Sequence, residues 1–95
     1  MATLLSSVTT DSVGTGASHS GPATVYVFGT FGDAFVDIEV SPDDTNYVSV
    51  DIDGNSIGRL RGPGCFQVGG NGTYYIRASV RNASATTSIS ASTTQ

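Results

Sequence analysis

The side chains in this sequence that could do chemistry are few and lie far apart in the chain. His19 is the only histidine, and its neighbours are Ser18 and Ser20. A histidine-based dyad or triad needs its base held in a fixed geometry beside the nucleophile, which sequence neighbours rarely have. His19 also falls in a Gly- and Ser-rich stretch without hydrophobic periodicity. We therefore expect a solvated loop histidine without a catalytic role.

Cys65 is the only cysteine and follows Gly62, Pro63 and Gly64. Nothing in the sequence identifies a base near its thiol, so a small buried residue at the start of a strand is favoured over a reactive group. A single cysteine excludes a disulfide within the chain. Because small secreted domains often use disulfides, this count favours synthesis inside the cell.

The acidic residues offer two further patterns. Asp51, Asp53 and Gly54 resemble the start of a calcium loop, but that loop needs glycine at its sixth position and glutamate at its twelfth. Here glycine comes fourth and another glycine stands twelfth, and a hairpin turn explains the residues. Asp37 and Glu39 project from one strand face, whereas a glycosidase needs two carboxylates opposed across a cleft. We therefore predict no catalytic residue, metal ligand or cofactor, and a protein that is not an enzyme.

The elements that would position these groups are β-strands, because β-branched and aromatic residues carry most of the apolar content. In residues 23–31, Val25 and Val27 point to one side, and Tyr26 and Phe28 point to the other. Both faces of this strand are apolar, unlike those of a strand with one wet side. Either the strand is covered on both faces, or the face with Tyr26 and Phe28 meets another chain.

The next two strands, residues 34–41 and 46–52, alternate most regularly. Between them, Pro42 presets the backbone of a type I turn. The predicted inward residues of these two strands are Ala34, Val36, Ile38, Val40, Val48, Val50 and Ile52.

Further short strands are predicted later in the chain, at residues 56–61, 65–68, 73–81 and 85–91. Seven or eight short strands with turn residues between them predict an all-β, antiparallel two-sheet sandwich of immunoglobulin-like or jelly-roll topology. A small barrel is an alternative that periodicity cannot separate. The expected core is formed by Val25, Val27, Val36, Ile38, Val40, Val48, Val50, Phe66, Val68, Ile76, Val80 and Ile89.

The chain divides into three predicted parts. Residues 1–22 form an N-terminal arm and a Gly/Ser-rich loop, residues 23–92 form the sandwich, and residues 93–95 form a frayed polar tail. The arm and loop are either ordered only by a partner, or form a long connection across the end of the sandwich.

The net charge of −4 argues against nucleic-acid binding, which favours a basic surface. No apolar run is long enough to span a bilayer, and the first residues lack the features of a signal peptide, so a soluble protein is predicted. Seven of the eight acidic residues lie between 33 and 53, and all four arginines follow. Either these are two solvated strand faces, or an acidic and an arginine flank meet across a subunit boundary.

Exposed aromatic side chains would mark a surface that binds something flat, either a protein or a sugar. Tyr47 and Tyr75 are the candidate platforms for a sugar. The candidate contacts with other proteins are the arm, the apolar strand face and the arginine flank, represented by Leu4, Leu5, Tyr26, Phe28, Phe35, Arg59, Arg61, Arg77 and Arg81.

Residues 29–51, GTFGDAFVDIEVSPDDTNYVSVD, resemble a pattern common in small structural proteins of tailed bacteriophages. The pattern joins a V-x-I-E-V-S strand, a Pro-Asp turn with Thr45-Asn46, and an aromatic residue followed by valine. Asp44 stands where glycine is usual, and Tyr47 where tryptophan is usual. The run at residues 74–78 and the Thr/Ser-rich last strand also fit the pattern.

This resemblance implies a small β-sandwich on the virion, made in the cytoplasm of the bacterial host. A capsid decoration (cement) protein is the expected type, with a neck or tail component as the alternative. Its partners would be further copies of itself and the major capsid protein or other virion proteins. A trimer would suit a site shared by three capsomers. A carbohydrate-binding sandwich is the second hypothesis, which needs no virion.

Overall fold

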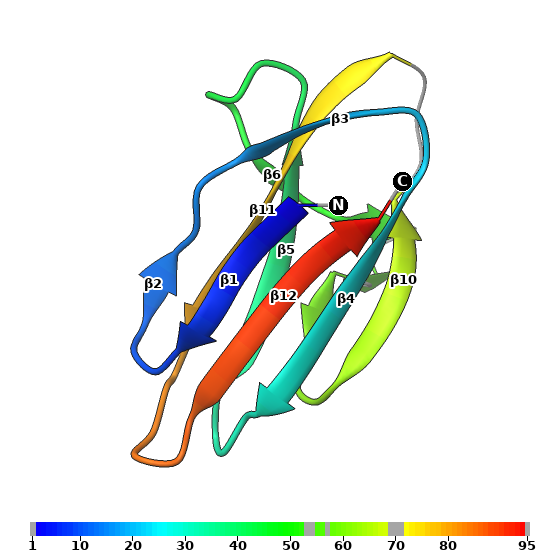
Figure 1. The fold of residues 1–95 in the computed structure, drawn as a ribbon. Helices are drawn as coiled ribbons and strands as arrows, with labels where there is room; N and C mark the ends of the chain where they lie inside the picture. The colour runs from blue at the N-terminus through cyan, green and yellow to red at the C-terminus, as the bar shows by residue number, and fades with distance from the viewer. Residues whose placement is uncertain (1, 53–54, 57, 69–71, 95) are drawn as a thin grey trace.

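A computed structural model describes residues 2–52, 55–56, 58–68 and 72–94, and only the backbone of residues 51, 52, 55 and 56. Two antiparallel sheets pack face to face, and the described residues contain no helix (Figure 1). Sheet A contains, in spatial order, β1 (Ala2–Val8), β12 (Ser88–Thr94), β4 (Ala23–Thr30) and β10 (Gly64–Val68).

Sheet B is built around two long central strands, β11 (Thr73–Arg81) and β5 (Phe35–Ser41). Short strands flank this pair on both sides: β2 (Ser12–Val13) and β3 (Ala17–Ser20) lie along β11, while β6 (Val48–Ser49) and β9 (Arg59–Leu60) lie along β5. A separate two-stranded sheet joins β7 (Asp51–Ile52) to β8 (Asn55–Ser56). The predicted turn at Asp53-Gly54 lies outside the described residues.

The order of pairing is that of a jelly roll. The first strand pairs with the last (β1 with β12), β2 and β3 pair with β11, β4 pairs with β10, and β5 pairs with β6 and β9. The chain is thus wound as nested antiparallel ribbons that pass from one sheet to the other. The predicted all-β sandwich is confirmed, and the strand order decides between the two topologies that the sequence left open.

The core is formed where the alternating rows of the long strands meet. Val36 and Ile38 of β5 lie opposite Val80 and Ala78 of β11, and all four are fully buried, as is Val25 of β4. Aliphatic side chains that point inward from paired strands remove their whole surface from water, which is the main source of stability in a small sandwich. The inward rows predicted for these three strands are therefore confirmed.

Within residues 2–22, the strands β1, β2 and β3 are part of the sandwich, which corrects the predicted boundary at residue 22. β1 pairs with β12, and Leu4 and Leu5 are both buried in the core. The register shifts between Thr3 and Leu5 and again between Leu5 and Val8. Such bulges break the two-residue period, which explains how two consecutive leucines face inward and why the alternation was not recognisable in the sequence.

The C-terminal boundary is also different from the prediction. β12 begins at Ser88 and continues to Thr94, and Thr93 is completely buried, so residues 93–94 are not a frayed tail. Before it, the Thr87 hydroxyl donates a hydrogen bond to the Phe31 carbonyl oxygen at 2.8 Å. This bond fastens the β11–β12 turn to the end of β4.

The third predicted strand is shorter than expected. Only Val48 and Ser49 join sheet B there, and Val48 is 61% exposed, although it was predicted to point inward. A two-residue strand at a sheet edge has no neighbouring strand on its outer side. The alternation of apolar and polar residues there does not predict which side chains are buried. Val50 packs partly against the core. The predicted inward side chain of Ile52 lies outside the described side chains.

Candidate docking surface

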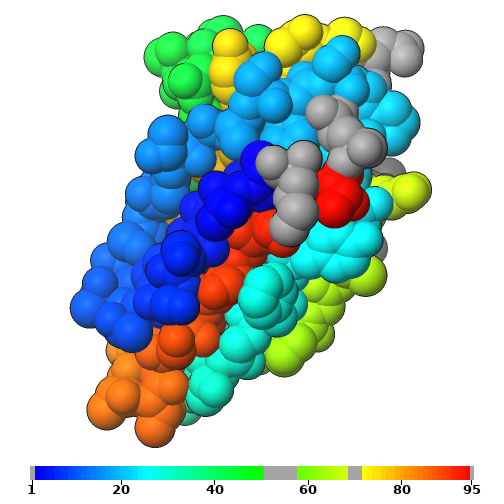
Figure 2. Space-filling model, viewed as in Figure 1, coloured from blue at the N-terminus to red at the C-terminus, as the bar shows by residue number. Residues whose placement is uncertain are grey.

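The outer face of sheet A carries no formal charge. Not one Asp, Glu, Lys, Arg or His occurs in β1, β4, β10 or β12, all four of which are fully described. This face is turned toward the viewer in Figure 2, where β4 (cyan) lies between β12 (red to orange) and β10 (yellow-green). Cores of protein interfaces are depleted in charged residues and enriched in aromatic ones, so the composition of this face suits contact with a partner.

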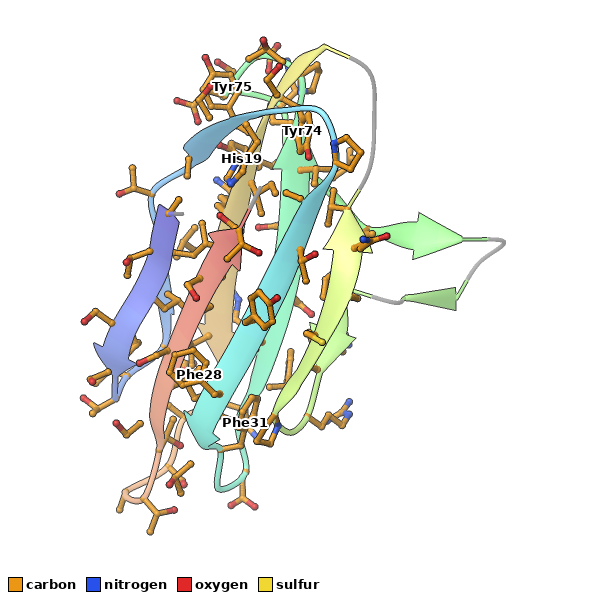
Figure 3. The ribbon with its side chains drawn as sticks, turned by 45° about the vertical axis from the view of Figure 1, so that its right-hand side comes forward. His19, Phe28, Phe31, Tyr74 and Tyr75 are labelled. Atoms are coloured by element: carbon orange, nitrogen blue, oxygen red, sulfur yellow. The ribbon has the colours of Figure 1, made fainter. Side chains whose placement is uncertain are left out.

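Tyr26 and Phe28 are the two large apolar side chains on this face, 39% and 51% exposed. Both belong to β4, where Val25 and Val27 point into the core, so the pleat sends Tyr26 and Phe28 outward. Tyr26 lies opposite Ser92 of β12. Phe28 stands on the solvent side of the sheet (Figure 3). The strand is therefore covered on one face only, and its other apolar face is open.

Gly29 follows these aromatics and fixes the close approach of β4 to β12. Its φ is 121°, and a Cβ atom there would lie 2.2 Å from the Ser88 carbonyl oxygen. The register of β4 with β12 continues unbroken through this position. Glycine at this position therefore relieves crowding between the two strands and does not mark a bulge.

Small hydroxyl groups and two uncharged polar side chains surround the aromatics. Ser90 lies opposite Phe28, while Cys65 of β10 lies opposite Tyr26. Cys65 is exposed, so the prediction that it is buried was wrong. The neighbouring Gln67 is also exposed. The face therefore offers aromatic rings, hydroxyls, a thiol and an amide, without a fixed charge.

The outer face of sheet B is different, because it carries charges and four of them form two ion pairs. The Arg59 Nε donates to Asp37 Oδ1 at 2.8 Å, and the Arg77 Nε donates to Glu39 Oε1 at 2.9 Å. Each pair joins residues directly opposite on neighbouring strands, where opposite charges attract. The Ser79 hydroxyl adds a further hydrogen bond to Glu39 Oε1 at 3.2 Å.

Two aromatic rings of sheet B are covered by arginines. The guanidinium carbons of Arg59 and Arg61 lie 4.6 and 5.1 Å from the centre of the Phe35 ring, and that of Arg77 lies 3.9 Å from the centre of the Tyr47 ring. Such cation–π contacts hold the arginines against the surface of their own chain. The acidic and arginine groups thus meet within the chain, and these pairs need no subunit boundary.

Tyr47 is further tied to its own turn. Its hydroxyl donates a hydrogen bond to Asp44 Oδ1. Partial burial, together with this hydrogen bond to the carboxylate, raises the pKa of Tyr47 to about 12. As a sugar platform Tyr47 would have one ring face already occupied by Arg77. Tyr75, the other predicted platform, is half-buried.

His19 is the residue that the sequence interpretation misplaced most. It is buried in β3, where the Ala17 carbonyl oxygen lies 2.9 Å from Nδ1 and the Thr93 hydroxyl lies 2.6 Å from Nε2. Because a carbonyl oxygen only accepts, Nδ1 carries the proton and Nε2 accepts from Thr93. The ring stacks on Tyr74 with centroids 6.0 Å apart (Figure 3). His19 therefore links sheet B to the end of sheet A and has no solvent-facing role.

The predicted contact residues thus separate into three groups. Leu4 and Leu5 belong to the chain's own core. Phe35, Arg59, Arg61 and Arg77 contact one another or nearby acids on sheet B, while Arg81 is exposed at the end of β11. Tyr26 and Phe28 remain as an open pair on an uncharged face.

Within the described residues, no group of three or more His, Cys, Asp or Glu side chains is placed to hold a metal ion. Nor does the described part of the chain form a helix of the length and hydrophobicity needed to cross a bilayer. No protein-family model matches the sequence, and comparisons with curated proteins and with solved structures gave no match.

Proposed function

We propose that this chain is a non-enzymatic structural protein of a tailed-phage virion, which decorates the head by placing the outer face of sheet A on neighbouring capsid subunits. The observation that carries the proposal is the separation of charge between the two sheets. One outer face pairs its charges internally, and the other has no charge and leaves Tyr26 and Phe28 exposed.

The assignment to a virion depends on the resemblance of residues 29–51 to small phage structural proteins. The jelly-roll strand order is compatible with it, since this topology occurs in viral capsid domains as well as in lectins. A shared fold is an analogy and does not specify a function. The docking face is therefore argued from the side chains of sheet A.

The proposed mechanism is mass action. A protein that binds an assembled shell, and not its separated subunits, lowers the free energy of the shell by an amount that grows with its own concentration. An uncharged face suits this role, because its contact with the shell buries no unpaired charge, which would be costly. The aromatic rings supply large contact areas with few rotatable bonds.

A binding experiment with capsids assembled without this chain tests the proposal. Phe28→Ser removes the most exposed ring of sheet A, and Val48→Ser is the matched control, an exposed apolar side chain at the edge of sheet B. We expect Phe28→Ser to weaken capsid binding about 30-fold, equivalent to the ~2 kcal/mol of a hot-spot aromatic. Val48→Ser should bind like the wild type.

Thermal unfolding of the two variants provides the stability control. Both substitutions change an exposed side chain, so each should alter the free energy of unfolding by no more than about 1 kcal/mol. Capsid binding by Phe28→Ser at wild-type strength would overturn the docking face. Binding to necks or tails alone would move the protein to another part of the virion, and Phe28-dependent retention on a glycan column would favour the carbohydrate-binding hypothesis.

A further inference from the structure

The edges of the two sheets differ in how well they are protected from pairing with another chain. An edge strand presents unpaired N–H and C=O groups, and natural proteins block them with bulges, charges, proline or short segments. Among the described strands, β1 is bulged and has Ser7 at a φ of 47°. The edges of sheet B are broken into the short strands β2 and β3 on one side, and β6 and β9 on the other.

β10 lacks these protections. Its five residues pair with β4 in an unbroken register, none of them has a positive φ, and none is charged. Pro63 stands just before the strand and not within it. Among the described residues, β4 is the one strand neighbour of β10, which forms the right-hand edge of sheet A in Figure 1. The outer edge of β10 is therefore an unbulged, uncharged template for another strand.

We infer that β10 pairs with β10 of a second copy of this chain, antiparallel about a two-fold axis perpendicular to sheet A, so that the two A sheets become one continuous sheet. A second copy fits because a two-fold contact places each patch against itself. Any charge near the axis would then face an identical charge. β10 has none, and the strand next to it, β4, has none either.

Phe66 fixes the register of this pairing. It is the central residue of β10 and points toward the interior, yet it is only half-buried, because in the described part of the chain no strand lies beyond β10 in sheet A. A register centred on Phe66 pairs all five residues and places the two Phe66 rings across from each other, where aromatic pairs stabilise sheets. In the same register, Cys65 lies opposite Gln67 of the second copy.

The first test measures the molar mass of the chain by sedimentation or light scattering over a wide concentration range. The wild type should rise from 9.7 kDa toward twice that value as its concentration increases. Gln67→Lys places a charge on the pairing edge and should remain monomeric throughout. Thr3→Lys adds the same charge at the exposed Thr3 of β1, on the opposite edge of sheet A, and should dimerise like the wild type.

The second test reads the register by cross-linking under mild oxidation. Residues directly opposite on paired strands have Cβ atoms about 4.5–5.5 Å apart, whereas diagonal neighbours are about 7–8 Å apart. Gln67→Cys in the presence of Cys65 should therefore form disulfide-linked dimers. The wild type has its thiol at position 65 alone, and the double variant Cys65→Ser/Gln67→Cys has its thiol at position 67 alone. Both would offer only diagonal thiols and should cross-link poorly.

The inference is overturned by a wild type that stays monomeric at every concentration, by a trimer, by Gln67→Lys dimerising as readily as the wild type, or by equal cross-linking of the wild type and the two cysteine variants. It does not depend on the proposed function. Phe28→Ser should dimerise normally even where it fails to bind capsids, so the failure of either proposal would be seen separately.

Discussion

The two outer faces of this sandwich treat polar groups in opposite ways. On sheet B, Arg59 and Arg77 are held by carboxylates on neighbouring strands and by aromatic rings. On sheet A, no charged group exists to be paired, and Tyr26 and Phe28 stand in solvent. The first face is complete within the chain, while the second leaves apolar surface uncovered.

This difference favours the outer face of sheet A over that of sheet B as a docking surface. A cluster of arginines and acids attracts attention in a sequence, but the cross-strand pairs at 2.8–2.9 Å show that the charges of Arg59 and Arg77 are compensated within the chain. An uncharged stretch of Ser, Thr and two aromatic residues attracts no such attention. Exposed aromatic rings nevertheless cost free energy in water, and a partner that covers them removes this cost. The contrast between the two faces would not hold if the ion pairs on sheet B contributed nothing to the free energy of unfolding, or if the two sheets did not fold as one unit.

The largest effect is expected where the two sheets are joined, at His19. His19→Ala removes a buried ring and leaves the hydroxyl of Thr93 without its partner, so it should lower the free energy of unfolding by about 2–3 kcal/mol. Thr93→Val, which keeps the shape and removes the hydroxyl, should cost about 1–2 kcal/mol. Denaturant unfolding of both variants and of the double variant measures the two costs and their coupling.

A strictly additive double variant would contradict the link, since residues that share a hydrogen bond are expected to couple. If the costs are as large as expected, the two outer faces belong to one rigid sandwich, and their contrast is a property of the folded state.

The sequence pattern predicted the central strands β4, β5 and β11 correctly and failed at the edge strands β1 and β6; it also placed the end of the central strand β12 too early. β4, β5 and β11 have neighbours on both sides, so the pleat is regular and a two-residue period reports burial. β1 is bulged, and β6 is two residues long at an edge. At these positions burial depends on partners distant in the sequence, which a local pattern does not specify.

The partners of the polar side chains could not be predicted from the sequence for a related reason. His19 and Thr93 look like surface residues, and they are buried because each satisfies the other across 74 positions of the chain. The uneven distribution of arginines and acids was visible, but the pairs Asp37–Arg59 and Glu39–Arg77 required the register of sheet B. The exposed aromatics of β4 were predictable, because alternation alone separates them from Val25 and Val27.

A smaller effect is expected from the charges of sheet B. Arg77→Ala removes the contact with Glu39 and the stacking on Tyr47, and should lower the free energy of unfolding by about 1 kcal/mol. Arg81→Ala, the matched loss of an exposed arginine on the same strand, should change it by less than about 0.5 kcal/mol.

Unfolding in low and in high salt separates the two contributions of Arg77. The ion pair is screened at about 1 M salt, where the Debye length is about 3 Å, so the cost of Arg77→Ala should shrink there without vanishing. Equal costs for Arg77→Ala and Arg81→Ala would mean that the ion pair on sheet B adds nothing to stability, and the contrast between the two faces would lose its basis.

The smallest effect is expected at the turn that follows β5 in the chain and contains Asp43. Backbone N–H groups of Asn46 and Thr45 donate to the Asp43 carboxylate and hold its pKa well below the ordinary value of 3.8. A depressed carboxyl pKa stabilises the folded state above the unfolded pKa, and that contribution is lost as the pH falls below it. Asp43→Asn should therefore flatten the decline in thermal unfolding temperature between about pH 4 and pH 2. An equally steep decline in Asp43→Asn and in the wild type would show that this turn does not contribute to the acid sensitivity of the fold.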